Sequence, residues 1–283
     1  MVPDIPNCLC RHAAAARGSF ETLADEMVPF GEATRMSFAT RVRELEDEFA
    51  AAAAVDGDVY LPNFTPSGPV DAVLIGMEPS LGWWARTPAE AAPKIAAGFR
   101  NFMWSPEDFI LHYAARRSLC SAGRTYHVTD ISKGAMTVKK AHIDRRARYT
   151  RWAVLLNKEV RLIAKPGAHI IAIGRDVFSF LERNGIDRNV KSIMHYSALA
   201  NAARNAAVMG REAEFLAFSE TLSMQDIVDV AAEVMQENSI SVAMSAETIT
   251  RLRKATLSES RKKLAFIYST VFAELSARGS AQG

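Results

Sequence analysis

The amino-acid sequence predicts an α/β protein with three layers, in which helices cover both faces of a central four-stranded, mainly parallel sheet. Four short apolar runs are typical of buried strands, and they lie at residues 70–75, 126–131, 169–173 and 190–194. Amphipathic stretches typical of helices lie between them, at residues 106–117, 148–163 and 177–184. Strands that alternate with helices make right-handed crossovers, which produce a parallel sheet with both faces covered.

Helical segments are expected on both sides of this α/β core. Residues 1–57 are expected to form an N-terminal helical segment, because apolar side chains recur at near-helical spacing among charges from Ser19 to Ala54. The α/β core is expected to span residues 58–205. It begins with a loop rich in Gly and Pro that leads into the first strand. Residues 206–283 return to helical spacing and are expected to form a C-terminal helical extension.

The composition suits one large folded domain, because 283 residues of which 49% are hydrophobic can bury a substantial core. No apolar run approaches the ~18 to 20 residues that span a bilayer. The first residues also lack a basic region followed by an apolar stretch, so a cytoplasmic protein without a membrane partner is expected. The three cysteines, Cys8, Cys10 and Cys120, are an odd set, which favours reduced thiols.

The basic residues are clustered although the net charge is only +2. One cluster lies within residues 139–165 and a second within residues 251–263. Clusters of this kind can neutralise the phosphates of a nucleic acid. An ordinary solvated helix face explains either cluster equally well.

The loops that follow the predicted strands are the natural place for a site, because ligands bind at the carboxyl ends of the strands in open parallel sheets. The first strand ends in Gly76-Met77-Glu78-Pro79-Ser80, and the fourth ends in His195-Tyr196-Ser197-Ala198-Leu199. Together these segments resemble the two signature motifs of the uracil-DNA glycosylase superfamily, and the resemblance covers residues 70–205. It implies a DNA glycosylase, which flips a base out of DNA and hydrolyses its bond to the sugar.

The resemblance assigns catalysis to Glu78 and His195. Glu78 matches the acidic residue of the motif, where a carboxylate stabilises the sugar cation and orients or deprotonates the attacking water. His195 matches the histidine that hydrogen-bonds the base oxygen on which negative charge develops. Both residues also have purely structural explanations. Glu78 could cap a helix N-terminus, and His195 could be a core histidine whose hydrogen bonds are satisfied within the protein.

The resemblance also implies contacts with DNA. Leu199 aligns with the leucine that fills the gap left by a flipped nucleotide. Polar and basic side chains near the two loops are expected to contact DNA: Ser197, Asn201, Arg204, Lys133, Lys139 and Lys140. One departure from the family pattern is Tyr196, which stands where the motif usually has proline, so the loop loses a fixed backbone angle and gains an aromatic ring.

Asp130 is the most informative departure. It ends the second strand, where relatives that process uracil carry an Asn, whose amide accepts from N3–H and donates to O4 of uracil. An ionised Asp cannot donate, whereas a neutral Asp suits cytosine by accepting from the N4 amino group and donating to N3. Burial in an apolar pocket favours that neutral form. An aspartate that merely caps the following turn would explain the residue as well.

Other residues are expected to line the base pocket. Ser80 and Met77 lie in the first loop, and the small Ser80 leaves room for a substituent at the 5-position of a pyrimidine. Phe99 and Phe102 are candidates to stack on the flipped base. The tryptophans in this region are expected in the pocket wall or the core: Trp83, Trp84 and Trp104.

No cofactor is expected. Some branches of the superfamily hold an iron–sulfur cluster with four cysteines, but this chain has three, and Gly134 follows Lys133 where those branches have a cysteine. The histidines also lack the paired spacing of a zinc site.

The sequence therefore predicts a monofunctional hydrolase that removes a flipped pyrimidine and leaves an abasic site. A 5-modified cytosine, as found in foreign viral DNA, is favoured. Repair of uracil or of another damaged base is the enzymatic rival. Two further hypotheses are a nucleic-acid-binding module that has lost catalysis and an enzyme for free nucleosides or nucleotides.

Overall fold

A four-stranded parallel sheet forms the centre of the computed structural model, which describes residues 36–280 except 83, 122, 142, 144, 187–189 and 198–199. Its strands are β2 (Val70–Gly76), β4 (Tyr126–Asp130), β6 (Ala164–Ile173) and β7 (Lys191–Ile193). The strand order is β4-β2-β6-β7, and every pairing in it is parallel. The predicted sheet is thus confirmed, and its four carboxyl ends lie at one edge.

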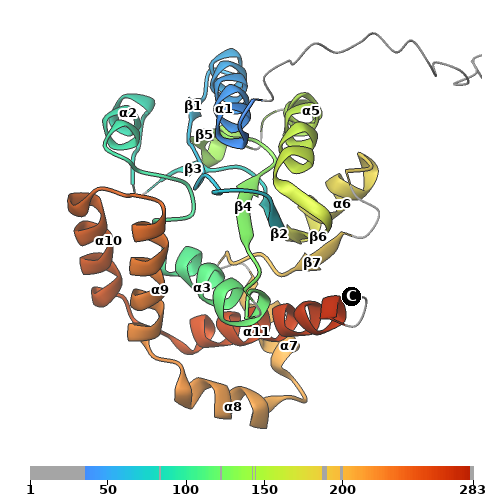
Figure 1. The fold of residues 1–283 in the computed structure, drawn as a ribbon. Coiled ribbons are helices and arrows are strands. Elements are labelled where there is room, and N and C mark those ends of the chain that lie inside the picture. The colour runs from blue at the N-terminus through green and yellow to red at the C-terminus, as the bar shows by residue number, and fades with distance from the viewer. Residues whose placement is uncertain are drawn as a thin grey trace, which may run out of the picture. The chain divides into compact units, whose positions relative to one another are not determined.

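Helices cover both faces of this sheet, as Figure 1 shows. On one face, α1 (Phe38–Val55), α5 (Arg145–Ile163) and α6 (Arg175–Arg183) share a core with Val73 and Ile75 of β2. On the other face, α3 (Pro106–Ala114) and the C-terminal helices pack against Ala72 and Leu74. Successive side chains of a strand point to opposite faces, so β2 contributes to both cores. The three-layer α/β arrangement follows from this division.

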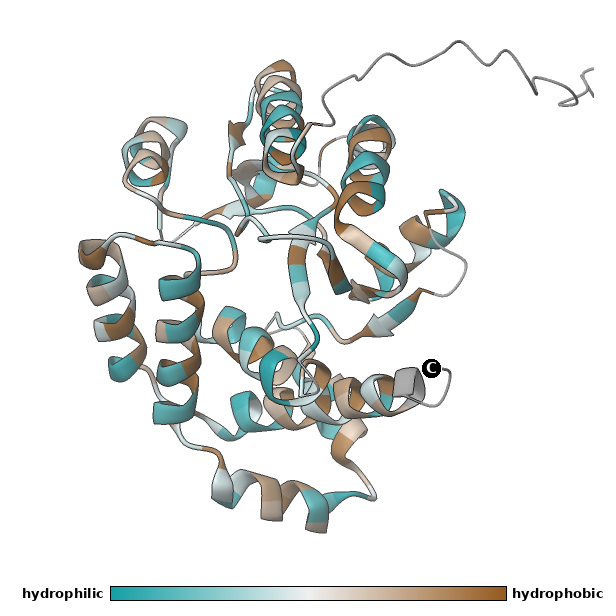
Figure 2. Ribbon diagram, viewed as in Figure 1, coloured by the Kyte–Doolittle hydropathy of each residue, from teal (hydrophilic) through white to brown (hydrophobic). Residues whose placement is uncertain are grey.

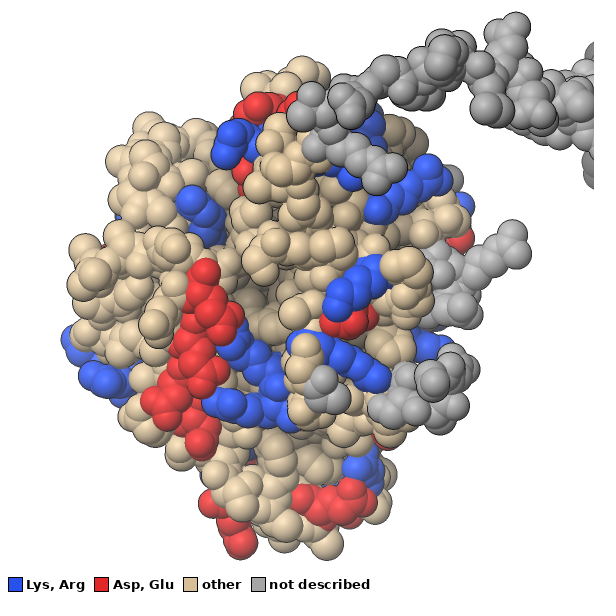
Figure 3. Space-filling model, in the orientation of Figure 1, with Lys and Arg blue, Asp and Glu red and all other residues tan. Residues whose placement is uncertain are grey.

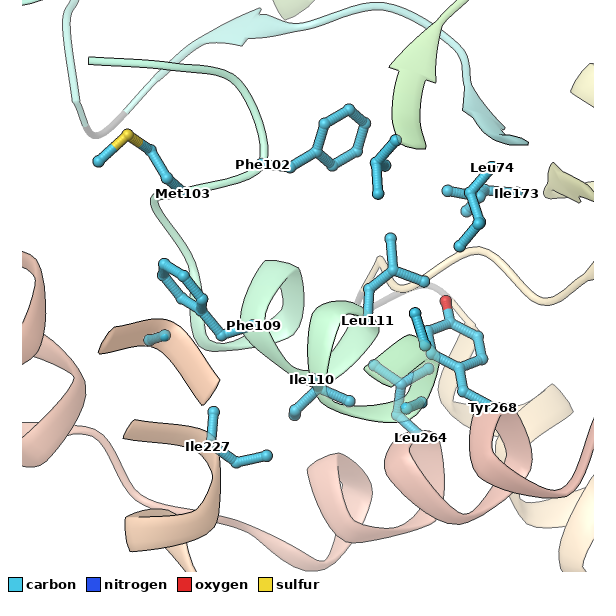
Figure 4. Packing of buried hydrophobic residues seen from close by; sticks show 14 of the residues in the cluster. Leu74, Phe102, Met103, Phe109, Ile110, Leu111, Ile173, Ile227, Leu264 and Tyr268 are labelled. Carbon is cyan, nitrogen blue, oxygen red and sulfur yellow. The ribbon is translucent and has the colours of Figure 1, made fainter. Parts of the chain in front are cut away.

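The helices described in the C-terminal part of the chain are α7 (Asn201–Val208), α8 (Glu212–Thr221), α9 (Met224–Glu237), α10 (Val242–Lys254) and α11 (Glu259–Ser280). Residues of α9, α10 and α11 join the core on the α3 side of the sheet, and Val208, Phe215 and Phe266 form a small cluster of their own. Hydrophobic and hydrophilic residues alternate along α9 and α11 in Figure 2, as the packing of one helix face requires. In Figure 4, Leu111 of α3 lies between Leu74 of the sheet and Leu264 and Tyr268 of α11. These helices are therefore part of one compact unit that begins at Met36.

Local sequence signals explain where several helices begin. Ser105 and Asp108 form a capping box before α3, in which the Ser105 hydroxyl accepts from the Asp108 N–H and the Asp108 carboxylate accepts from the Ser105 N–H. Pro106 occupies the first helical position, where its missing N–H costs nothing. The last turn of this helix continues as a π-helical turn, η1 (Ala115–Leu119). The predicted helix at 106–117 is therefore confirmed, with a changed final turn.

A second, three-stranded sheet lies against the strand-end loops, and the sequence did not predict it. Its strands are β1 (Val59–Tyr60), β5 (Gly134–Thr137) and β3 (Ser80–Leu81), in the order β1-β5-β3. Because β3 follows the loop after β2 and β5 follows the loop after β4, their pairing ties these two loops together. The short helices α2 (Pro88–Ala96) and α4 (Val138–Ala141) were also not predicted.

The described part of the predicted N-terminal helix is α1. Ser37 caps α1 by accepting from the Thr40 N–H, and residues 19–35 of the predicted helix lie outside the described part of the chain. None of the described helices is long and apolar enough to cross a membrane.

Candidate active site at the strand ends

The loops after β2 and β4 lie side by side at the carboxyl edge of the large sheet. Gly76 and Asp130 are paired in register at the ends of these strands. The pairing continues into the loops, where the Ile131 N–H donates to the Gly76 carbonyl at 3.0 Å and the Ser132 N–H donates to the Met77 carbonyl at 3.2 Å. The first predicted motif segment is thus in direct backbone contact with the loop that follows Asp130.

Asp130 is buried at this edge, with 3% of the residue exposed. Its Oδ2 accepts a hydrogen bond from Nδ2 of Asn101 at 2.7 Å. Its Oδ1 lies so close to Gly76 that a Cβ at that position would be 2.2 Å away. Burial raises the pKa of the Asp130 carboxyl to about 7, against the opposing effects of the Asn101 hydrogen bond and the Lys133 charge. The carboxyl group therefore takes up a proton near neutral pH.

Phe102 lies beside Asp130, and Phe99 does not. The Phe102 ring approaches Gly76, since its Cζ would be 3.4 Å from a Cβ placed there. Its backbone has a φ of 58°, in the left-handed region that non-glycine residues rarely adopt. Phe99 is stacked on Trp84 with centroids 4.5 Å apart, and its ring also meets Trp104 edge-on. Phe102 is therefore the better placed of the two candidates to stack on a base.

Glu78 is held by side chains from the first turns of α5. Its Oε1 accepts from Arg145 at 2.8 Å, its Oε2 lies 3.6 Å from a nitrogen of Arg148, and the Tyr149 hydroxyl also donates to Oε2. The carboxylate is 6% exposed, and these partners offset the cost of burying its charge.

His195 begins the loop after β7 with a defined imidazole orientation. The Ser197 backbone N–H donates to Nδ1 at 3.0 Å, so Nδ1 is the unprotonated nitrogen and Nε2–H is a donor. Burial and then the charge of Arg204 lower the pKa of His195, although Glu78 and Asp176 act the other way. The neutral ring is stacked on Tyr196 with centroids 4.8 Å apart. The aromatic ring at position 196 thus packs on the imidazole and supports it.

Arg204 supports the His195 loop from inside the protein. It is 3% exposed and donates to the carbonyls of Tyr196 and Ser197, to the Asn201 side chain and to the Ser260 hydroxyl. In this structure the Arg204 guanidinium is buried and engaged within the protein, so its contact with DNA stays a prediction that this conformation does not present. Asn201 is exposed at the start of α7, and Ser197 is partly buried.

Lys133, the second basic residue predicted to contact DNA, is likewise buried. It is 1% exposed, and its Nζ donates to Glu159 at 2.6 Å and to the Asp130 carbonyl. The partner of this charge, Glu159, lies 26 residues further along the chain, so no local pattern indicates that Lys133 is paired within the protein. Lys140 is partly exposed, and it bridges to Asp58 at 2.6 Å and to the carbonyls of Asp56 and Gly57.

The remaining predicted residues differ in their exposure. Lys139 is exposed on α4, and Ser80 is exposed on β3. Met77 is partly buried and packs against the core on the α5 side. Leu199, predicted to fill the gap left by a flipped nucleotide, lies outside the described residues, as do Ala198 and Trp83.

Much of the basic cluster at 139–165 is engaged in ion pairs within the protein. Besides the contacts to Glu78, Arg151 pairs with Asp56, Lys158 with Glu48 and Lys165 with Asp71. In the second cluster, the Arg251 guanidinium lies 3.5 Å from the centre of the Trp104 ring and Arg261 pairs with Glu107. Clustering in the sequence therefore overstates the charge available to a nucleic acid.

A cavity of about 550 Å³ lies away from these loops, at the amino ends of β2 and β4. Figure 3 shows an acidic stripe over α9 beside basic residues in the middle of the visible face. The cavity is lined by Arg116, Arg117, Glu233 and Glu237, and these arginines pair with these glutamates. This edge is opposite the one where ligands bind in parallel sheets, so we place the candidate site at the strand-end loops.

Comparison with known proteins adds no assignment, because no family model, curated protein or solved structure matches the chain. The described residues contain no group of three or more His, Cys, Asp or Glu side chains that could hold a metal ion. Of the three cysteines, Cys120 lies in the described part of the chain and is a free thiol, whereas Cys8 and Cys10 lie outside that part.

Proposed function

We propose that this protein is a monofunctional DNA glycosylase, similar to the uracil-DNA glycosylase superfamily, which hydrolyses the bond between the sugar and a flipped, cytosine-derived base. The observation that carries the proposal is the environment of Asp130, a buried carboxyl group whose pKa lies at about 7, beside Phe102. A neutral acid at this place both donates and accepts, which complements N3 and the N4 amino group of cytosine. Phe102 offers the aromatic face on which a base stacks.

Two further groups support hydrolysis. His195 donates from Nε2, so it suits the oxygen of a departing pyrimidine on which negative charge develops. Glu78 carries a carboxylate in the neighbouring loop, which suits stabilisation of the sugar cation and orientation of a water. The proposal requires local opening of the loops, because Asp130 and Phe102 are both buried.

The exposed Ser80 extends the proposal to the 5-position of the base. A small, exposed side chain at the start of β3, directly after the loop that carries Glu78, suits a base with a substituent, which favours a 5-modified cytosine in foreign DNA. Repair of uracil or of a damaged base is the enzymatic rival.

A panel of duplex oligonucleotides tests the proposal. Each carries one uracil, cytosine, 5-methylcytosine or 5-hydroxymethylcytosine, and abasic sites are scored by alkali cleavage. The wild type should release a cytosine-derived base and little uracil, and Asp130→Asn should lose that activity. Efficient release of uracil by the wild type would overturn the cytosine assignment but not the glycosylase assignment. No release from any oligonucleotide would overturn both.

A non-catalytic nucleic-acid-binding module is the second candidate. It is favoured by the ion pairs of Glu78 with Arg145 and Arg148, which give this carboxylate a structural role. The same oligonucleotides distinguish the two candidates, because a binding module would retain them in a filter-binding assay without releasing any base.

A further inference from the structure

Asp130 ends a chain of buried hydrogen bonds that crosses four segments of the protein. Asn101 donates from Nδ2 to Asp130 at 2.7 Å and to Oδ1 of Asn63 at 3.1 Å. Asn63 donates from Nδ2 to the Thr129 hydroxyl at 2.9 Å, and that hydroxyl donates to Oε1 of Glu159 at 2.9 Å. Asn63, Thr129, Asp130 and Glu159 are all buried, so these polar groups depend on one another for partners.

The charge of Glu159, at the other end of this hydrogen-bond network, determines which group donates in each of its hydrogen bonds. Glu159 is buried with Lys133, and although burial opposes the effect, Lys133 and His127 lower the pKa of the Glu159 carboxyl to about 2. Glu159 is therefore ionised and accepts only, so the Thr129 hydroxyl must donate to it. The Thr129 oxygen then accepts from Asn63, which turns the Asn63 carbonyl towards Asn101.

Asn101 consequently has a single possible orientation. Both of its N–H groups are used, and its Oδ1 accepts from the Phe102 backbone N–H at 3.1 Å. Flipping the amide would place its oxygen against the acceptors of Asp130 and Asn63 and its nitrogen against an N–H. Oδ2 of Asp130 therefore always faces a donor. When Asp130 is neutral, its proton is therefore on Oδ1, the oxygen that lies against Gly76.

The position of that proton matters because a neutral carboxyl group does not by itself distinguish the two bases. With the hydroxyl facing N3 and the carbonyl facing the 4-position, it pairs with cytosine. With the two oxygens exchanged, it accepts from N3–H and donates to O4, and so pairs with uracil. A buried donor or acceptor left without a partner costs about 1 to 3 kcal/mol, which is enough to select between bases.

We propose that Asn101 is a positioning residue that determines base specificity: it holds the Asp130 proton on Oδ1, and a cytosine that turns N3 towards Oδ1 and its amino group towards Oδ2 then pairs with the carboxyl group. The Glu159–Lys133 pair anchors Asn101 through Thr129 and Asn63. The inference rests on the proposed function for the identity of the base. The orientation of the amide and its effect on Asp130 are properties of the protein alone.

Other ionisable groups act on Asp130 from the surrounding elements. They are Glu78 in the loop after β2, Asp108 on α3, Lys133 in the loop after β4, Tyr149 on α5 and Tyr196 in the loop after β7. Substitution of Asn101 leaves all of them in place, so it isolates the contribution of the amide.

The experiment combines a titration with the oligonucleotide panel. Asn101→Leu keeps the side-chain size but removes the donor, and Asn101→Ser serves if the first variant does not fold. Thr129→Val interrupts the hydrogen-bond network at a group that is separated from Asn101 by Asn63. Asn238→Ala, just after the C-terminal end of α9, is the control. The pKa of Asp130 is read from its carboxyl carbon signal by NMR, without any substrate.

Loss of the Asn101 donor should raise the pKa of Asp130, because this hydrogen bond lowers it in the wild type. The ratio of cytosine-type to uracil release should fall at least tenfold, with a smaller fall in the same direction for Thr129→Val. An unchanged pKa in a folded Asn101 variant, or an unchanged release ratio, would overturn the inference. If the wild type releases no base at all, the proposed function fails, and with it the specificity role, while the titration still decides the orientation of the amide.

Discussion

At the scale of single residues, the proposed catalytic role of Glu78 must be distinguished from the structural role that its ion pairs give it. It accepts from Arg145 and Tyr149 and lies near Arg148, so its loss affects both charge and packing. A substitution that keeps the shape of the side chain is therefore the informative one.

Glu78→Gln should lower the single-turnover rate on the oligonucleotide that the wild type cleaves by about a hundredfold or more, because the sugar cation loses its carboxylate. Affinity for the same DNA should change little. Tyr149→Phe is the matched control, since it removes one donor to Glu78 and leaves the charge. Equal rate losses in the two variants, matched by equal losses of stability, would assign Glu78 a structural role.

Gly76 is a second residue at which a substitution should disturb the site, because a side chain there would collide with Asp130. Gly76→Ala would place a Cβ 2.2 Å from Oδ1 of Asp130 and 3.4 Å from the Phe102 ring. The Asp130 carboxyl group must then move, at a cost of about 1 to 3 kcal/mol in unfolding free energy, as measured by urea denaturation. Base release should be lost with it. Gly68→Ala, which meets nothing within 4 Å, should leave stability and release unchanged.

At the scale of elements, the sequence predicted the parts of the site that lie at strand ends. Apolar runs locate β2 and β4, and parallel pairing then places Gly76 beside Asp130. Asn63 and Asn101 were missed because they lie 38 residues apart in the chain, and only folding brings them together. Lys133 was assigned to the surface by its charge, since nothing local indicates its pairing with Glu159. The strands of the small sheet are only two to four residues long, too short to show a period.

Helix α11 supports the loop that carries His195 through side-chain hydrogen bonds. The Tyr268 hydroxyl donates to the Met194 carbonyl at 2.6 Å, directly before His195. Ser260, in the first turn of the same helix, accepts from Arg204. The C-terminal residues therefore hold the loop that carries the histidine, although the sequence pattern left their role open.

Tyr268→Phe should remove this hydrogen bond and leave the ring in the core. The unpaired carbonyl should lower the unfolding free energy by about 1 to 3 kcal/mol. The single-turnover rate should also fall, because the His195 loop is no longer fixed from behind. Tyr113→Phe, on α3, is the control, because its ring packs against the same core. A rate that stays at the wild-type value while stability falls would limit Tyr268 to packing.

At the scale of the whole molecule, buried ionisable groups connect folding to pH with opposite signs. Burial lowers the pKa of His112 to about 4 from 6.5, so the unfolded chain binds that proton first and stability is lost as pH falls from 6.5 towards 4. Asp130 behaves in the opposite way. Its pKa is raised from 3.8 to about 7, so the folded chain binds the proton first and stability is gained as pH falls from 7 towards 3.8. The two contributions partly cancel in the wild type.

Asp130→Asn should reveal how much the Asp130 carboxyl group contributes to the pH dependence of the unfolding free energy. The variant has no proton to gain at this position, so the wild type should become more stable relative to it by about 3 kcal/mol between pH 8 and pH 5, a value that follows from the pKa difference. Urea unfolding at each pH unit in this range measures the change. Asn238→Ala, in which no ionisable group is altered, should differ from the wild type by the same amount at every pH. Parallel curves for Asp130→Asn and the wild type would mean that the carboxyl group is already ionised in the folded protein at pH 5, and the neutral acid required for reading cytosine would then be absent.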